Sequence, residues 1–256
     1  MVKTRTKIFT ADDISRIETE YSLLTDNLYR CDKPGDRELI DKAFRFANEA
    51  HRDMYRNSGE PYIIHPINVA RIVNQEIGLG AKSVSAALLH DVVEDTGIPL
   101  EEISKQFGPK IASLIDGLTK ISGTYNKETN SLQAENFRKM LMTLSDDFRV
   151  ILVKIADRLH NMRTLDSMPE HKRMKIAGET IYLYAPLAHR LGLFAIKTEL
   201  EDLSFKFRHP RIYDEIVRKV KMDEKKNLAL INRFSLPIIE ALNNNNILFD
   251  ISGRFK

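Results

Sequence analysis

Cysteine and tryptophan are nearly absent from this sequence. Among its 256 residues there is one cysteine, Cys31, and there is no tryptophan. A single cysteine excludes an internal disulfide framework and a zinc site made of several cysteines, and it is typical of a protein from a reducing compartment. Because aromatic residues make up only 8% of the chain, we expect a core that consists mainly of aliphatic side chains.

The chain also lacks a large excess of one charge and a long apolar run. Lys and Arg number 39 and Asp and Glu 36, which gives a net charge of +3, and this is too balanced to argue for nucleic-acid binding on charge alone. No stretch approaches the roughly 18 apolar residues of a membrane helix, and residues 1–10 lack the apolar segment of a signal peptide. We therefore expect a cytoplasmic protein that binds neither membranes nor nucleic acid.

Helical periodicity runs through almost the whole chain. Apolar residues recur at steps of three and four, which is typical of amphipathic helices. The pattern predicts helices over 11–30, 37–54, 66–76, 81–95, 98 onward, 133–145, 147–166, 170–191, 196–208 and 210–243. The expected fold class is therefore all-α.

Two segments interrupt this pattern. Residues 122–131 are polar and without period, which predicts a flexible loop and a candidate switch element. Residues 247–252 are strand-like and follow four consecutive asparagines. Because an isolated strand is not stable, we interpret 247–256 as the start of a truncated second domain, 201–246 as a helical connector and 1–200 as the main domain.

One segment, 88–95, gathers titratable side chains. If it is a continuous helix, His90, Asp91, Glu94 and Asp95 lie at about 0°, 100°, 40° and 140° around its axis. Three carboxylates that share one face repel one another, so the face requires a compensating positive charge. The combination of His with Asp suits a first-row transition metal.

The segment 151–164 has a polar line on an otherwise apolar helix. Its apolar stripe consists of Ile151, Ile155, Leu159 and Met162. Its polar line consists of Asp157, His160, Asn161 and Thr164. Burying such a line is costly unless its members are paired or bind a ligand, and helical bundles build metal sites from facing helices in this way.

Together these segments predict a metal centre. His65, His90, Asp91 and Asp157 give an ion two imidazoles and two carboxylates, and the open positions suit a metal-activated hydroxide. Glu94 and Asp95, one turn further on, are candidates for acid–base work.

Each of these residues also has an ordinary explanation when it is taken singly. A histidine before a proline, such as His65, is more often structural, and an Asp–Arg pair such as Asp157–Arg158 is usually a surface ion pair. Glu94 and Asp95 alone are typical of a solvated helix end. It is their joint occurrence that favours a metal-dependent hydrolase.

The order of these residues resembles the HD superfamily of metal-dependent phosphohydrolases. Four longer segments, 56–66, 89–96, 156–164 and 184–192, resemble the RelA/SpoT family of bacterial stringent-response enzymes, and the resemblance runs from about residue 37 to the end. It implies a helical HD-domain bundle that removes the 3′-pyrophosphate of the alarmone (p)ppGpp, leaving GDP or GTP, with one Mn²⁺ ion. A covalently linked synthetase domain is the implied partner.

The same resemblance implies residue roles. The four metal ligands and the acidic pair keep the roles given above. The implied substrate-binding residues are Arg56, which stacks on the guanine, together with Asn57, Ser58, Asn161 and Thr164. The family usually has lysine where this sequence has Asn57, which removes one basic contact. We further expect Lys154 and Arg158 to neutralise the anionic substrate.

Two other functions remain open on the sequence alone. One is an HD phosphohydrolase that acts on another nucleotide. The other is a catalytically silent module that binds the alarmone and regulates an attached synthetase. All six metal-binding and acidic positions are intact, which favours an active hydrolase.

Overall fold

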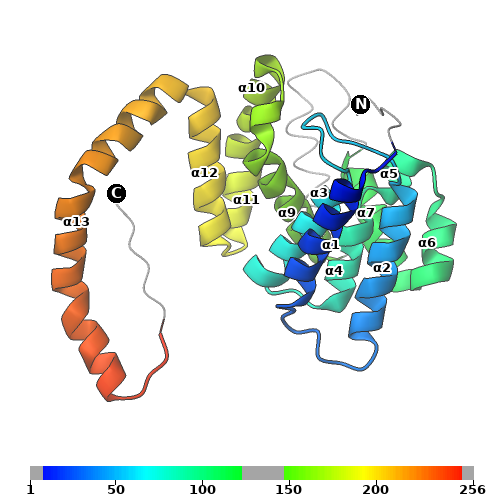
Figure 1. The fold of residues 1–256 in the computed structure, drawn as a ribbon, viewed down its shortest axis with the longest axis horizontal. Helices are drawn as coiled ribbons and strands as arrows, with labels where there is room; N and C mark the ends of the chain where they lie inside the picture. Colours follow the sequence, from blue (N-terminus) through cyan, green and yellow to red (C-terminus); the bar gives the residue numbers. More distant parts are fainter. Residues whose placement is uncertain (1–7, 123–146, 250–256) are drawn as a thin grey trace. The chain divides into compact units, whose positions relative to one another are not determined.

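The computed structural model describes residues 8–122 and 147–249, and this part of the chain is helical (Figure 1). Within it, the β-type pairing consists of one isolated bridge between Tyr55 and Pro61. The predicted all-α class is confirmed. The predicted helix 133–145 and, apart from Ser122, the predicted loop 122–131 lie outside the described residues.

The helices follow one another with short connections. The first group is α1 (Ala11–Thr25), α2 (Asp36–Ala50), α3 (Ile64–Arg71) with a π-helical turn (Ile72–Glu76), α4 (Ala81–Leu89), α5 (Val92–Thr96), α6 (Leu100–Phe107) and α7 (Pro109–Ser122). The second group is α9 (Arg149–Arg163), a 3-10 turn (Leu165–Ser167), α10 (Glu170–Glu179), a π-helical turn (Thr180–Tyr184), α11 (Ala185–Arg190), α12 (Phe194–Arg208) and α13 (Pro210–Asn244).

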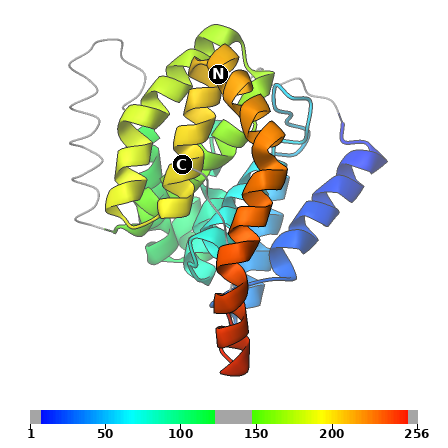
Figure 2. The same ribbon diagram turned by 90° about the vertical axis from the view of Figure 1, so that its left-hand side faces the viewer.

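The chain divides into two compact units between Ser204 and Phe205. The second unit contains α13, a long helix with Pro237 in its interior, drawn in orange and red in Figure 2. The expected strand is not formed over 247–249, and its remainder lies outside the described residues. The division of the sequence into 1–200, 201–246 and 247–256 stays a prediction.

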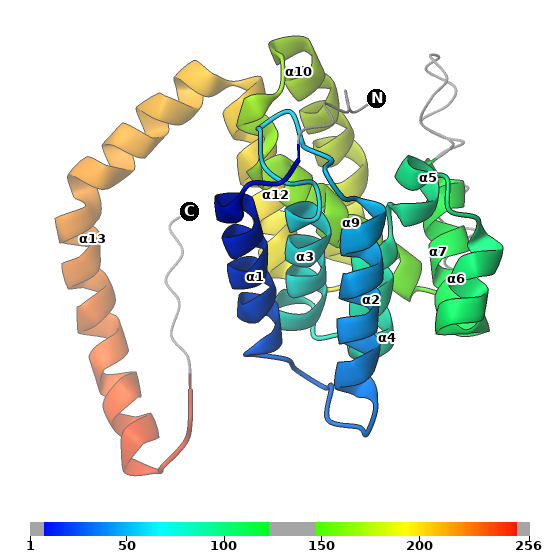
Figure 3. The same ribbon diagram turned by 45° about the vertical axis from the view of Figure 1, so that its right-hand side comes forward.

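Helix α4 lies at the centre of the first unit. It is apolar or small on almost every side, and all of its residues except Lys82 are buried, as expected for a helix without a polar face. It packs against α2, α3, α7 and α9, and Figure 3 shows α2, α3 and α4 side by side. Gly80 precedes it, where a Cβ atom would meet the Arg30 carbonyl oxygen at 2.8 Å.

The predicted single helix over 81–95 is wrong, because it breaks at His90 and Asp91. Helix α4 ends at Leu89, and the His90 ring Nδ1 lies 2.8 Å from the Ala87 carbonyl oxygen. A side chain that satisfies a carbonyl in the last turn stabilises a helix end. Asp91 then precedes α5, and its carbonyl accepts the Asp95 N–H. The angles calculated for an unbroken helix therefore do not apply.

The predicted helix over 11–30 also ends early, at Thr25. Beyond it, the Asn74 side chain holds Tyr29, accepting from its backbone N–H at 2.9 Å and donating to its carbonyl at 2.7 Å. These bonds replace helical ones. At the other end, Thr10 caps the helix and Asp13 returns a bond to the Thr10 N–H, which makes a capping box.

The predicted helix over 170–191 contains a π-helical turn, Thr180–Tyr184, immediately before α11. Pro186 stands in the first turn of α11. Proline lacks an N–H and clashes with the preceding turn of a regular helix. A wider turn at this point accommodates its ring within a nearly continuous helical segment.

No helix in the described residues is both long and apolar enough to cross a bilayer.

Candidate functional site

The four predicted metal ligands converge from separate helices. His65 lies in the first turn of α3, His90 and Asp91 occupy the break between α4 and α5, and Asp157 lies on α9. His65 Nε2 is 3.2 Å from Asp157 Oδ1 and 3.7 Å from Asp91 Oδ2. His90 Nε2 is 3.1 Å from Asp91 Oδ2 and 3.9 Å from Asp157 Oδ1.

The burial and spacing of these atoms fit a single cation. One ligand atom each from His65, His90 and Asp157 lies within 4.8 Å of the others, and all three residues are buried. Asp91 joins this group through its short distances to both imidazoles. Two imidazoles and two carboxylates form a donor set that suits a divalent transition metal.

An unsatisfied nitrogen supports the same assignment. His90 Nε2 is buried and makes no hydrogen bond of regular geometry, although it lies 3.1 Å from Asp91 Oδ2. A buried polar atom without a partner is costly. A cation that accepts the lone pair of this nitrogen would remove that cost.

The charges of the cluster also favour a cation. Burial opposes a charge on His90, but the neighbouring Asp91 outweighs it and raises the pKa of His90 to about 9. In turn, although burial acts against it, His90 lowers the pKa of the Asp91 carboxyl below its usual value. The carboxylates thus attract positive charge to the position that an ion would take.

Tyr62 links the cluster to the predicted acidic pair. Its hydroxyl oxygen lies 2.6 Å from Asp91 Oδ2 and 2.7 Å from Asp95 Oδ2. Burial and the charge of Asp91 raise the pKa of Asp95. The Tyr62 ring stacks on the buried His51 ring, with centroids 4.8 Å apart.

Three neighbours of the cluster were not predicted as such from the sequence. They are Tyr62, His51 and His160, whose Nδ1 lies 2.7 Å from His65 Nδ1. Burial lowers the pKa of His65 to about 4, and burial together with His65 lowers the pKa of His160 to about 2, so both rings are neutral at pH 7. The sequence pattern placed His160 in the polar line on α9, but it did not predict the contact of His160 with His65.

The acidic pair occupies the exposed side of α5. Both side chains are exposed, and the Tyr62 hydroxyl contacts Asp95. Burial lowers the pKa of Lys154, but the charges of Asp157 and, to a smaller extent, Glu94 raise it. Both carboxylates therefore lie at the edge of the cluster and not within it.

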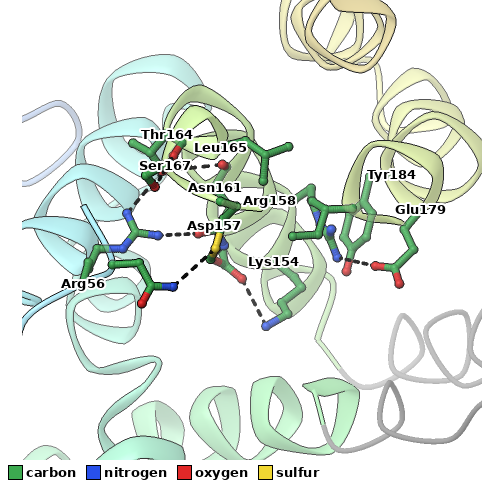
Figure 4. A pocket seen from close by; sticks show the side chains of 13 residues that line it. Arg56, Lys154, Asp157, Arg158, Asn161, Thr164, Leu165, Ser167, Glu179 and Tyr184 are labelled. Carbon is green, nitrogen blue, oxygen red and sulfur yellow. Dashed lines mark hydrogen bonds and ion pairs between the residues drawn. The ribbon is translucent and has the colours of Figure 1, made fainter. Parts of the chain in front are cut away.

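A cavity of about 340 Å³ opens beside Asp157 (Figure 4). Four of the five predicted substrate-binding residues line it, namely Arg56, Asn57, Asn161 and Thr164. Ser58 is not among the lining residues and is exposed. Tyr184 forms part of the far wall.

The loop that carries Arg56 is a tight hairpin. Gly59 has a φ of +86°, and its N–H donates to the Arg56 carbonyl, while the Arg56 N–H donates to the Glu60 carbonyl at 2.9 Å. This turn exposes Asn57 and Ser58 at its tip. Glycine is favoured at such a φ because it lacks a Cβ atom.

Asn161 connects Arg56 to the metal-ligand cluster. Its Oδ1 accepts from the Arg56 guanidinium at 2.7 Å, and its Nδ2 donates to Asp157 Oδ1 at 2.6 Å. Thr164 Oγ1 accepts a second Arg56 bond at 3.3 Å. The flat guanidinium is therefore held at one edge along the cavity wall, as Figure 4 shows.

The two cations expected to neutralise substrate charge already have acidic partners. Lys154 Nζ is 3.2 Å from Asp157 Oδ2, and Arg158 is 3.2 Å from Glu179 while lying 4.3 Å over the Tyr184 ring. Both line the cavity. Lys154 thus already offsets the charge of Asp157, a predicted metal ligand, without a bound substrate.

Comparisons with known proteins agree with this geometry. Residues 43–194 match the model of the HD domain. A guanosine-3′,5′-bis(diphosphate) 3′-pyrophosphohydrolase from Haemophilus influenzae is 45% identical over 82% of this chain and 31% of the relative. The bifunctional (p)ppGpp synthase/hydrolase SpoT of Escherichia coli K12 is 44% identical over 84% of this chain and 30% of the relative. The chain thus spans about a third of the length of these relatives.

A solved structure shares the fold. It is described as a metazoan ortholog of SpoT that hydrolyses ppGpp, and it matches with a TM-score of 0.51 and 23% identity over 67% of this chain and 96% of its own. With the family model covering more than half of the chain and relatives of about 45% identity, this protein belongs to the HD domain family, in the branch that contains the RelA/SpoT proteins.

Proposed function

We propose that this chain is a Mn²⁺-dependent hydrolase that removes the 3′-pyrophosphate of guanosine 3′,5′-bis(diphosphate). The observation that carries the proposal is the convergence of His65, His90 and Asp157 within 4.8 Å, beside a cavity that Arg56 lines. The named activities of the relatives support the choice of substrate.

The ion would be held by His65, His90, Asp91 and Asp157. A divalent cation in such a site lowers the pKa of a bound water and polarises a phosphoryl oxygen. The chain contributes the fixed position of the ligands, since they lie on helices that pack in the core or in the short break between α4 and α5. Lys154 Nζ, at 3.2 Å from Asp157 Oδ2, partly neutralises the negative charge of the cluster.

The acidic pair would move the protons. In the net reaction, the oxygen of water forms a bond to the phosphorus attached to the 3′-oxygen, and the bond between that phosphorus and the 3′-oxygen breaks. One carboxyl of Glu94 and Asp95 accepts a proton from the water, and the leaving 3′-oxygen gains one. Burial and Asp91 raise the pKa of Asp95, which is the direction that favours its acid form.

The cavity would bind the nucleoside. Arg56 is fixed at its edge by Asn161 and Thr164, which leaves the planar face of the guanidinium for a base to stack on. Asn57 donates to the sulfur of Met168 at 3.4 Å and brings no charge. Ser58, at the exposed tip of the turn, would approach the nucleotide only from the mouth of the cavity.

The direct test is the release of GDP and pyrophosphate from ppGpp. We expect turnover by the wild-type chain with Mn²⁺, its loss after treatment with EDTA, and its recovery when Mn²⁺ is restored. Asp91→Asn should abolish turnover. Asp116→Asn is a matched control, because Asp116 pairs with Lys120 on α7 and is not part of the cluster. Turnover that is equal in Asp91→Asn and wild type would contradict metal-dependent hydrolysis.

The choice of Mn²⁺ needs its own measurement. The metal-free protein is reconstituted with Mn²⁺, Co²⁺, Zn²⁺ or Mg²⁺ in turn, and kcat is measured with ppGpp. We expect the highest kcat with Mn²⁺. A higher kcat with another ion would contradict the choice of Mn²⁺ but not the proposed hydrolysis.

A regulatory role is the second candidate function. The Escherichia coli relative is named as a bifunctional synthase/hydrolase, and the chain spans 30% of it. This supports a linked synthetase domain in the full-length protein and a place in the stringent response. If the chain binds ppGpp but releases no pyrophosphate with any of the four ions, this second role is favoured.

A further inference from the structure

The two imidazoles of the cluster are oriented in different ways. The ring Nδ1 of His90 lies 2.8 Å from a backbone carbonyl, that of Ala87. The ring Nδ1 of His65 lies 2.7 Å from a second imidazole nitrogen, Nδ1 of His160. All three histidines are buried, so water does not readily replace either bond. His160 therefore contacts the His65 ring at Nδ1, just as the Ala87 carbonyl contacts the His90 ring at Nδ1.

Counting protons fixes the direction of the bond between the two rings. At 2.7 Å the two nitrogens share one proton, because two protons between them would clash. The opposite nitrogen of His65, Nε2, faces Asp157 Oδ1 at 3.2 Å. If Nε2 is a metal ligand, it carries no proton, so the N–H of the His65 ring is at Nδ1, and His160 Nδ1 accepts it.

We propose that His160 is a positioning residue of the metal centre, which holds His65 in the tautomer and the ring orientation that a ligand needs. This inference rests on the proposed metal-dependent function. A ligating histidine commonly donates its second ring N–H to a carboxylate, a backbone carbonyl or water, and such partners fix the ring and raise its basicity. Here a neutral imidazole takes that place. His160 is not among the residues that line the cavity.

The test compares two substitutions by their affinity for Mn²⁺, measured by EPR of free Mn²⁺ in the absence of nucleotide. His160→Leu removes the acceptor, and we expect its affinity to fall about 10- to 100-fold. His160→Asn places an amide oxygen near the position of Nδ1, and we expect it to recover most of that loss. Ser204→Ala is the control, because it removes another buried hydrogen bond, to Leu200, within α12.

A second measurement needs no substitution. In wild-type protein with ¹⁵N-labelled histidine and bound Zn²⁺, NMR should place the His65 proton on Nδ1. A proton on Nε2, or equal Mn²⁺ affinity in wild type and His160→Leu, would overturn the inference. A wild type that binds Mn²⁺ but does not hydrolyse ppGpp contradicts the proposed function alone, whereas one that binds no divalent ion contradicts both.

Discussion

The two sides of the candidate site are built differently. The cluster side consists of His65, His90 and Asp157, which are buried and lie on or next to core helices. The cavity side includes the hairpin 55–61, whose tip residues Asn57 and Ser58 are exposed. The proposed metal-dependent chemistry is thus placed in the core, and the proposed substrate recognition is placed on a loop, a kind of segment that tolerates change.

The largest loss of activity is expected from a substitution on the cluster side. Asp157→Asn removes a predicted ligand and weakens the ion pair with the partly buried Lys154. We expect kcat for ppGpp hydrolysis to fall by about 10³-fold or more, because the activated water is lost. Asp116→Asn again serves as the control. A loss that appears only in KM would contradict the role of Asp157 as a ligand.

A smaller effect is expected at the link between the cluster and the acidic pair. Tyr62→Phe removes one oxygen and keeps the ring that stacks on His51. Asp91 and Asp95 then lose a shared partner, and we expect kcat to fall about 10- to 100-fold with a modest change in KM. Tyr21→Phe is a matched control, since its hydroxyl donates to Asp41, and neither residue belongs to the site. An unchanged kcat in Tyr62→Phe would show that the Tyr62 hydroxyl does not link the acidic pair to the cluster in a way that affects turnover.

On the cavity side, the effect should shift from kcat to KM. Arg56→Ala removes the planar group, and we expect KM to rise about tenfold, which corresponds to about 1.4 kcal/mol and lies within the range for base stacking. Arg56→Lys keeps the charge but not the plane, so it should restore little. If Arg56→Lys restores KM fully, charge and not stacking is what Arg56 contributes.

The smallest change is expected at the tip of the hairpin. Asn57→Lys adds a positive charge at an exposed position, where a single ion pair contributes at most about 1 kcal/mol. We expect KM for ppGpp to fall roughly threefold at low ionic strength and the gain to disappear in high salt. Asn57→Gln controls for side-chain length. A gain that persists in high salt would indicate a contact other than a simple charge.

The sequence was sufficient where a pattern is local. On α9 the apolar stripe of Ile151, Ile155, Leu159 and Met162 is buried, so the polar line opposite it was placed correctly by helical period alone. The hairpin at 55–61 likewise contains the turn-forming residues Asn57, Ser58 and Gly59, and the structure adds its hydrogen bonds. Short-range geometry of this kind depends mainly on backbone preferences.

The sequence was insufficient where contacts are distant or a side chain competes with the backbone. The break at His90 depends on an imidazole bond to Ala87 that helical period does not encode. The pair of His65 and His160 spans 95 positions, and Tyr62 meets Asp91 across 29. Such contacts follow from packing, which no local pattern specifies.

One amide group has a consequence for how ligands affect one another. Asn161 bonds at one end to Arg56 and at the other to Asp157, so any molecule that displaces the guanidinium changes the environment of the carboxylate as well. Free-energy coupling between two sites is reciprocal. If binding of the nucleoside base changes the affinity for the ion through this amide, binding of the ion must change the affinity for the base by the same factor.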